Sequence, residues 1–272
     1  MTTKPAILEE RFGAVLRLSH DRPEFRNAES EGLLRELDNA LERAAADPEI
    51  RVVIIGGTGD HFSAGHDLKE WRALRSGFGV EERWAFEEEC YYNYSMRLWN
   101  FPKPTIAQVQ GGCIAGAFMV ANMCDLMVAS DDAFFADPVS STLGAAAVEV
   151  LIHPWVMGLR RAKEFLYTGE RISAEEAYRI GMASHVVPRA DLETETLKLA
   201  ERIAKTPPFA LKLIKRSLNR TADIQGLANS LNAHFDTHQL SHVTNEFKAI
   251  SDSGMEKAIT RGKAMLATEG DS

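Results

Sequence analysis

Residues 103–130 read KPTIAQVQGGCIAGAFMVANMCDLMVAS. The apolar run at 105–111 predicts a buried strand, and the run at 124–130 predicts another of the same kind. Glycine and alanine dominate between the two runs, and a helix is expected to begin near Gly116. A strand, a helix and a second strand in this order are the repeating unit of an α/β layered domain.

The chain before this stretch has the same alternation. Residues 14–20 alternate as a strand does, and the β-branched run RVVIIGG at 51–57 predicts a strand covered on both faces. Between them we expect a helix over 30–46, whose apolar face comprises Leu33, Leu34, Leu37, Ala40, Leu41 and Ala44. The remaining elements expected in this half are a turn or loop at 22–28, a polar helical region at about 67–99 and a further strand at 133–138.

From about residue 160 onward the hydrophobic periodicity is helical. Helices are expected over 160–169, 173–181, 190–205, 207–220 and 224–266. No strand is predicted in the C-terminal third. The sequence therefore predicts an α/β core, to which we assign residues 1–200, and a helical C-terminal region, residues 201–272.

Composition excludes several classes of protein. The 272 residues carry a formal net charge of −8, which argues against a nucleic-acid partner. The longest apolar region, 113–129, is interrupted by Asn122 and Asp125, so we expect no membrane span. Residues 1–13 contain acidic side chains where a signal peptide needs an apolar core. The three cysteines show no paired spacing, which argues against a disulfide framework or a zinc site. We therefore expect a soluble, cytoplasmic protein.

Several familiar motifs are absent. The G-x-S-x-G motif fails around Ser63 because His61 stands two residues before it, and the chain has no Walker A loop and no H-E-x-x-H. His234, His238 and His242 follow one another at helical spacing and share one face. Either adjacent pair could bind a metal with a further ligand from elsewhere, but the outer two lie about 12 Å apart along the axis. We expect a solvated or interfacial helix face here and no metal site.

Two segments place small residues where a strand gives way to a helix. They are FSAGHDL at 62–68 and QGGCIAGAF at 110–118. Helix starts expose unpaired N–H groups with partial positive charge, and small residues let a ligand approach them. If the two strands are neighbours, two N–H groups can point at one oxygen and form an oxyanion hole. The alternative is that glycine and alanine serve only tight contact between helix and sheet.

These segments resemble the signatures of the crotonase (enoyl-CoA hydratase/isomerase) superfamily. HFSAGHDLKEW at 61–71 is similar to the pattern F-x-x-G-x-D-[LI], and residues 103–130 resemble the second signature of the family. RRAKEFLYTGERISAEEAYRIGMASHVVP at 160–188 resembles a third, and TPPFALKLIKRSLN at 206–219 matches the helix that follows it. The resemblance extends over residues 8–266.

The resemblance implies a fold and a class of substrate. The fold is a spiral of ββα units with a helical C-terminal region that builds a homotrimer or a dimer of trimers. Residues 1–200 would carry the coenzyme A site and the oxyanion hole, and residues 201–272 would serve oligomerisation and contact coenzyme A. The substrate is an acyl-CoA thioester, as in fatty acid metabolism. No tightly bound cofactor is expected, because coenzyme A enters as part of the substrate.

The resemblance also assigns roles to residues. The thioester oxygen would be held by the backbone N–H groups of His66 and Gly116, and the stabilised enolate explains how one scaffold supports hydration, isomerisation, dehalogenation and C–C cleavage. We expect the side chain of His66 to point away from the chemistry and Asp67 to cap the following helix. The residues expected to contact the substrate around coenzyme A are Glu24, Phe25, Arg26, Ala64 and Gly65.

The sequence differs from the family at the two positions that carry the catalytic acid and base. The hydratases place two glutamates over the reacting carbons, and here Met119 and Val139 stand at those positions. Neither side chain transfers protons, so both are expected only to contact substrate, and a standard two-glutamate hydration is not expected.

Other residues are candidates for the missing proton transfer. Glu149 lies in the apolar run AAAVEVLI, and burial there is expected to raise the pKa of its carboxyl. The alternative is that Glu149 is exposed or pairs with Arg160 or Arg161. Asp137 and His153 are weaker candidates.

The sequence therefore predicts an acyl-CoA-processing enzyme, a lyase or isomerase with non-standard acid and base residues. A non-catalytic acyl-CoA-binding protein and a coenzyme A-independent hydrolase or lyase stay open as alternatives. The aromatic residues of 71–100 are expected either to wall the acyl pocket or to belong to the core. They include Trp84, Phe86, Tyr91, Tyr92, Tyr94 and Trp99.

Overall fold

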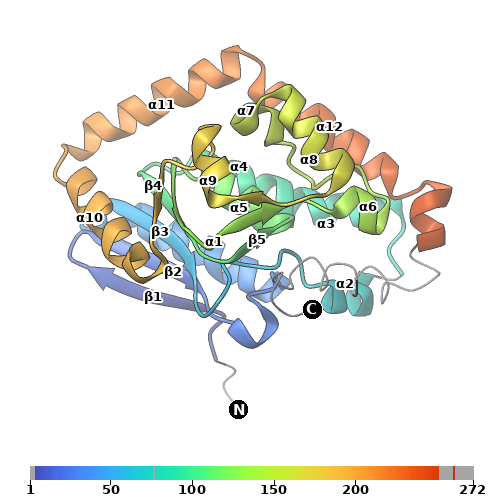
Figure 1. Cartoon of the computed structure of the whole chain (residues 1–272), viewed down its shortest axis with the longest axis horizontal. Coiled ribbons are helices and arrows are strands. Elements are labelled where there is room, and N and C mark those ends of the chain that lie inside the picture. Colours follow the sequence, from blue (N-terminus) through green and yellow to red (C-terminus); the bar gives the residue numbers. More distant parts are fainter. Residues whose placement is uncertain (1–3, 76, 251–259, 261–272) are drawn as a thin grey trace.

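The computed structural model describes residues 4–75, 77–250 and 260, and its elements form two sheets surrounded by helices (Figure 1). Most of the predicted helical stretch 224–266 beyond residue 250 lies outside the described residues. The division into a core of 1–200 and a C-terminal region of 201–272 therefore stays a prediction.

The main sheet, as described, has the strand order β1-β2-β3-β4-β6-β9. Its strands are β1 (Ile7–Phe12), β2 (Val15–His20), β3 (Val52–Gly57), β4 (Thr105–Val109), β6 (Leu126–Ser130) and β9 (His185–Val187). β1 and β2 form an antiparallel hairpin, and each following pair of neighbours is parallel. The strands predicted at 14–20, 51–57, 105–111 and 124–130 thus lie side by side, and the predicted α/β class is confirmed.

A second, smaller sheet contains β5 (Gly112–Ile114), β7 (Phe134–Ala136) and β8 (Ile172–Ser173). The strand predicted at 133–138 is β7, so it belongs to this sheet and not to the main one. The segment 110–118 does not turn directly into a helix, because β5 forms between β4 and the helix start at Gly116.

The prediction of no strand in the C-terminal third is wrong. β9 pairs in parallel with β6, with His185 opposite Val128, and forms the edge of the main sheet. The strand spans three residues, which is too short for an alternating pattern to stand out in the sequence.

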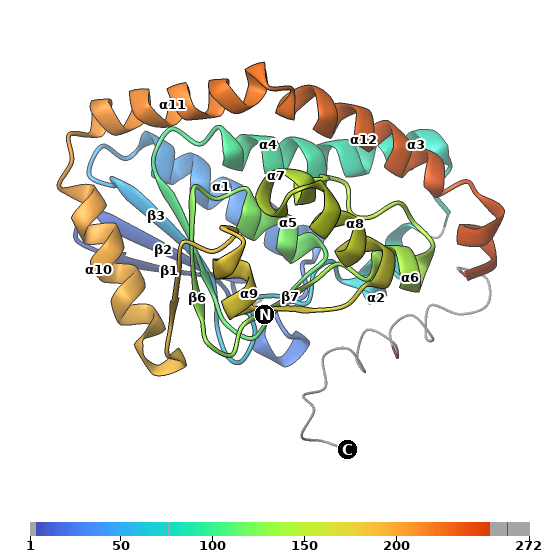
Figure 2. The same cartoon turned by 45° about the horizontal axis from the view of Figure 1, so that its top comes forward.

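Helices cover both faces of the main sheet (Figures 1 and 2). α10 (Leu192–Ala204) packs Leu192, Ala200 and Ala204 on one face, against side chains of β2, β3, β4 and β6. α1 (Glu31–Ala46) and α5 (Gly116–Asn122) cover the other face. The shorter helices are α2 (Leu68–Arg75), α6 (Val139–Leu143), α7 (His153–Met157), α8 (Leu159–Thr168) and α9 (Ala174–Arg179).

The sequence pattern of α1 accounts for its placement. Ser30 caps the helix, since its hydroxyl accepts a hydrogen bond from the N–H of Leu33 at 3.1 Å. All six residues of the predicted apolar face are buried beneath it. That prediction is confirmed, because a stripe with helical period depends only on local spacing.

Two long helical runs border the site. α3 (Val80–Glu87) and α4 (Tyr94–Trp99) are joined by the π-helical segment Glu88–Asn93. α11 (Pro208–Ile224) and α12 (Leu227–Ser241) follow each other along the outside of the molecule, with α3 and α4 beneath them in Figure 2. The helical C-terminal region is thereby confirmed as far as it is described. None of the described helices is both long and apolar enough to cross a membrane.

Candidate active site

The two predicted strand-to-helix junctions lie next to each other. The N–H of Ser63 donates to the carbonyl of Gly112 at 3.1 Å, and the N–H of Ile114 donates to the carbonyl of Ser63 at 3.1 Å. These bonds form a parallel bridge between Ser63 and Cys113. The bridge holds the loop after β3 against β5, so the residues that follow on each segment are brought together.

Gly65 makes this approach possible. Its φ is +80°, and a Cβ at this position would lie 2.5 Å from the carbonyl oxygen of Ile114 and 3.2 Å from the nitrogen of Gly116. Only glycine fits both the space and the backbone angle. Among the described residues, no carbonyl or side chain accepts a hydrogen bond from the N–H of His66 or of Gly116. Two unpaired donors therefore lie on neighbouring segments.

The turn at residues 24–26 and Ala64 are neighbours, as the resemblance implied. The N–H of Ala64 donates to the carbonyl of Arg26 at 2.9 Å. Phe25 is 50% exposed on the same turn, and Glu24 is exposed beside it. The two segments thus form one continuous surface next to the junction at Gly65.

Asp67 caps α2, which confirms the structural role expected for it. One carboxylate oxygen accepts hydrogen bonds from the N–H groups of Lys69 and Glu70, both at 3.2 Å. The other oxygen pairs with the guanidinium of Arg22 at 3.1 Å. The acid is fully engaged in holding the turn.

The side chain of His66 does not turn away from the site, and that expectation is wrong. Its Nδ1 lies 3.2 Å from a carboxylate oxygen of Glu29, and its Nε2 lies 3.2 Å from a carboxylate oxygen of Glu149. The ring stacks on Tyr91 with the centroids 3.8 Å apart. Gly116 leaves the necessary space, because a Cβ there would lie 2.4 Å from Cε1 of His66.

Electrostatics fix the charges of this arrangement. Burial alone would lower the pKa of His66, but the carboxylates of Glu149 and Glu29 raise it to about 10. Burial alone would raise the pKa of Glu149, but the positive charge and hydrogen bond of His66, with the charge of His238, lower it to about 2. At neutral pH the site therefore holds a histidinium beside an ionised carboxylate.

This result corrects the expectation of a raised pKa for Glu149. The apolar neighbours are present and Glu149 is only 5% exposed, as its surroundings in the sequence indicated. The partner is His66, however, and not Arg160 or Arg161. A buried carboxylate with a cation at hydrogen-bond distance keeps its charge, whereas one without a cation loses it.

Three hydrogen bonds hold the segment that carries Glu149. The N–H of Val150 contacts Sδ of Met119 at 3.2 Å. Two bonds come from α12: Nε2 of His234 meets the carbonyl of Val148 at 2.9 Å, and the hydroxyl of Ser241 accepts from the N–H of Ala146 at 3.0 Å. Met119 is buried in α5, so its contact with Val150 fixes the segment of Glu149 to that helix. The direction in which Glu149 points is therefore set by α5 and α12.

His66 and Glu149 face a cavity of about 60 Å³. Val139 lines it, as do Leu68, Trp71, Tyr91, Leu143 and Phe247, and three further polar residues are Glu87, His238 and His242. Sequence reasoning missed Glu29, Tyr91 as a ring partner, and Glu87. No local pattern marks these residues, because their role follows from contacts with distant segments.

Residues 10–264 match the model of the family described as enoyl-CoA hydratase/isomerase. The chain belongs to this family.

Among its relatives in the family is a putative enoyl-CoA hydratase of Mycobacterium tuberculosis, 42% identical over 247 residues, which are 85% of this chain and 78% of the relative. A crystal structure of a probable enoyl-CoA hydratase from Mycobacterium smegmatis superposes with a TM-score of 0.82 at 44% identity and covers 87% of this chain and 94% of that one. An enoyl-CoA hydratase/isomerase from Xanthobacter autotrophicus gives a TM-score of 0.88 at 34% identity, over 98% of this chain and all of that one.

The two weaker candidates for proton transfer, Asp137 and His153, lie away from the cavity that His66 and Glu149 face. Asp137 and His153 are fully buried and face each other at 3.2 Å. Asp137 also accepts a hydrogen bond from the N–H of Val139 at 3.1 Å, and His153 stacks on Phe118. Neither is among the described residues that line the cavity. Their geometry is that of a buried structural pair.

Most of the aromatic residues between 71 and 100 belong to the core. Trp84 and Tyr92 both pack against Phe235 of α12, with ring centroids 5.2 Å apart in each case. Tyr94 is fully buried. Of this group, Trp71 and Tyr91 are the described residues that reach the cavity wall.

We expect Glu149→Gln to lower the pKa of His66 well below about 10, because the variant removes the carboxylate charge that most favours the histidinium. The charge of His66 stabilises the fold fully below its ordinary pKa of 6.5, and this contribution declines as pH rises through about 10. The variant should therefore lose on the order of 3 kcal/mol near neutral pH and a smaller amount near pH 10.

Titration of the His66 ring by NMR, together with urea unfolding at several pH values, measures both effects. An unchanged pKa of His66 in the variant would contradict the assignment of Glu149 as its partner.

Proposed function

We propose that this protein processes acyl-CoA thioesters through an enolate, with the N–H groups of His66 and Gly116 as the oxyanion hole and Glu149 as the residue that transfers protons. The observation that carries the proposal is the position of Glu149. Its carboxylate is buried on the cavity wall, ionised, and 3.2 Å from the ring of His66. Membership of the enoyl-CoA hydratase/isomerase family supplies the substrate class.

In the proposed step, Glu149 accepts the proton from the α-carbon of the acyl group. The electrons of the broken C–H bond move onto the thioester oxygen and form an enolate. The two N–H donors stabilise that oxygen, since they have no other acceptor among the described residues and are fixed in place by the Ser63–Cys113 bridge. Glu149 then returns the proton to carbon or to a leaving group.

The low pKa of Glu149 sets a condition on this chemistry. A carboxylate with a pKa of about 2 is a weak base. The barrier to proton abstraction must therefore be lowered mainly by stabilisation of the negative enolate oxygen. The histidinium of His66 supports this, because its positive ring lies against Gly116 at the oxyanion site. Proton transfer to Glu149 also removes the negative charge that holds His66, which makes the return of the proton favourable.

Met119 and Val139 support a departure from the two-glutamate hydration of the family. Met119 is 1% exposed and contacts a backbone N–H with its sulfur, and Val139 presents an aliphatic side chain to the cavity. Neither side chain can bind or release a proton. Met119 is not among the described residues that line the cavity, so the contact with substrate expected for it is replaced by a role in holding the segment of Glu149. We assign to Val139 a role in shaping the acyl site, and proton transfer to Glu149.

The remaining assignments follow the family. We propose that Glu24, Phe25, Arg26, Ala64 and Gly65 contact the coenzyme A part of the substrate, that no tightly bound cofactor takes part, and that the protein acts in the cytoplasm. The surface shared by residues 24–26 and Ala64 supports the first of these assignments.

A second candidate is a non-catalytic acyl-CoA-binding protein. It is favoured by the ion pair itself, because His66 and Glu149 stabilise each other and leave neither group poised near neutral pH. In that case the oxyanion site binds the thioester carbonyl, and no proton moves.

The two candidates differ in the effect of Glu149→Gln on activity. With an acyl-CoA that the protein turns over, we expect the variant to lower kcat about 100- to 10,000-fold while the thioester still binds. Asp137→Asn is the matched control, because it alters a buried carboxylate away from the cavity, and it should leave kcat within a few-fold. A panel of acyl-CoA thioesters that bind without any turnover would instead support the binding protein.

Hydration of short straight-chain enoyl-CoA substrates should be slow. Without the two glutamates, we expect a turnover number far below the roughly 10–1000 per second of an efficient enzyme. Ultraviolet absorbance of the conjugated thioester measures the rate directly. Turnover in that range would show that Met119 and Val139 do not impair hydration.

We also propose that the protein forms a homotrimer or a dimer of trimers through its C-terminal helices. α11 exposes Phe209, Leu213, Ile214, Leu218 and Ile224, of which Leu218 is 66% exposed. An apolar surface of this kind on one helix is typical of a face that another subunit covers.

Leu218→Asp is expected to weaken this assembly, because it places a charge in a buried apolar contact. Light scattering after gel filtration should give the mass of a trimer or hexamer of the 30.1 kDa chain for the native protein, and a smaller mass for the variant. Tyr178→Asp, at a 57% exposed aromatic residue of α9, is the control that should leave the mass unchanged. A monomeric native protein would contradict the proposal.

A further inference from the structure

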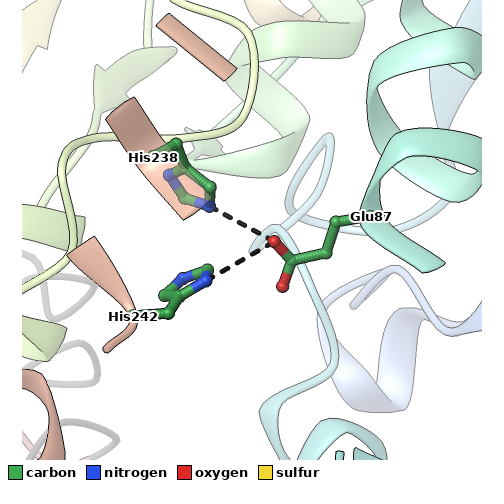
Figure 3. A group of neighbouring side chains, drawn as sticks. All are labelled: Glu87, His238 and His242. Atoms are coloured by element: carbon green, nitrogen blue, oxygen red, sulfur yellow. Dashed lines mark ion pairs between the residues drawn. The ribbon is translucent and has the colours of Figure 1, made fainter. Parts of the chain in front are cut away.

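A second group of polar side chains lies on the wall of the same cavity. Glu87 ends α3, His238 lies in the last turn of α12, and His242 immediately follows that helix. Figure 3 shows both rings turned toward the carboxylate of Glu87. The distances from Oε2 of Glu87 are 3.5 Å to Nε2 of His238 and 3.6 Å to Nδ1 of His242.

The three side chains are almost completely withdrawn from solvent. Their exposed fractions are 2% for Glu87, 3% for His238 and 7% for His242. The two contacts to Glu87 are longer than ordinary hydrogen bonds, and both nitrogens are buried without a hydrogen-bond partner among the described residues. Buried polar atoms of this kind require a partner, and here they converge on one point.

We propose that Glu87, His238 and His242 bind a divalent transition-metal ion such as Zn²⁺, Co²⁺ or Fe²⁺.

The donor set and its spacing fit such an ion. Two imidazoles and one carboxylate are ligands that these ions share. One ligand atom from each residue lies within 4.8 Å of the other two. Bonds of about 2.0–2.1 Å at tetrahedral angles place neighbouring ligand atoms about 3.3 Å apart, close to the 3.5 and 3.6 Å that separate Oε2 of Glu87 from the two histidine nitrogens.

The surroundings leave the carboxylate available. Gln239 donates a hydrogen bond to Oε2 of Glu87 at 2.7 Å, and a guanidinium nitrogen of Arg83 lies 3.6 Å from Oε1. Partners of this kind orient a ligating carboxylate without occupying all its lone pairs. The π-helical segment Glu88–Asn93 begins immediately after Glu87, and such segments are frequent at functional sites.

The third histidine of the face is excluded. Nε2 of His234 bonds the carbonyl of Val148 at 2.9 Å and holds the segment of Glu149. Of the two expected alternatives, a solvated or an interfacial face, the structure shows the interfacial one, and the ligand that a histidine pair lacks comes from α3.

The position of the site indicates an open coordination position. Glu87, His238 and His242 line the cavity that His66 and Glu149 also face. Glu149 lies 3.7 Å from Nε2 of His238 and is close enough to act as a further ligand or to orient that ring. Three protein ligands beside a cavity leave a position for water or an oxygen of a ligand, which is the arrangement of catalytic and not of structural sites.

Without a metal, the ring of His238 lies between the carboxylates of Glu87 and Glu149, which raise its pKa against the effect of burial. In that arrangement the side chains interact with one another and not with an ion, and the protein takes up no metal ion. The two descriptions therefore differ in metal uptake, which can be measured in the absence of any acyl-CoA.

Full-length protein without an affinity tag is treated with a chelator, dialysed, and titrated with Co²⁺ while the visible absorption of the bound ion is followed. We expect one Co²⁺ per chain, and Zn²⁺ should remove the Co²⁺ bands. His242→Ala and Glu87→Gln should each lower the affinity at least about 100-fold, since even orienting residues contribute about 10- to 100-fold.

His185→Ala, at an exposed histidine of β9, is the matched control and should bind as the native protein does. His242→Gln keeps the volume of the side chain and replaces His242→Ala if that variant does not fold, as judged by circular dichroism. Binding below one fifth of an equivalent, or equal affinity in the ligand variants and the native protein, overturns the proposal. Either result leaves the proposed enolate chemistry unaffected.

Discussion

The site depends on one buried contact, the histidinium of His66 between the carboxylates of Glu29 and Glu149. Each of the three groups would be costly to bury alone, and their opposite charges offset part of that cost. They also come from three separate parts of the chain: the turn just before α1, the loop after β3 and the segment after α6. The contact therefore fixes the shape of the cavity as well as its charge.

That contact relies on two residues without side chains. Gly65 allows the loop to approach β5, and Gly116 leaves room for the His66 ring. Such requirements are steric and local, so the glycine-rich junctions were recognisable in the sequence. The stripe of α1 and the apolar strands were predictable for the same reason, since each depends on the spacing of residues along one element.

The orientation of His66, the low pKa of Glu149 and the pairing of β9 were not predictable. The charge of Glu149 depends on a histidine 83 positions earlier in the chain, and its local apolar neighbours suggested the opposite shift. Glu87 likewise meets His238 and His242 across about 150 residues. Sequence spacing carries no information on contacts between segments so far apart unless a known motif connects them.

α12 has two tasks that no other described helix combines. It bonds the segment of Glu149 through His234 and Ser241, and it directly follows α11, which presents the apolar surface. Both bonds reach residues within three positions of Glu149, at Ala146 and Val148. α12 thus ties the segment that carries Glu149 to the helix whose apolar surface is exposed, and the chain itself provides a direct connection between the two.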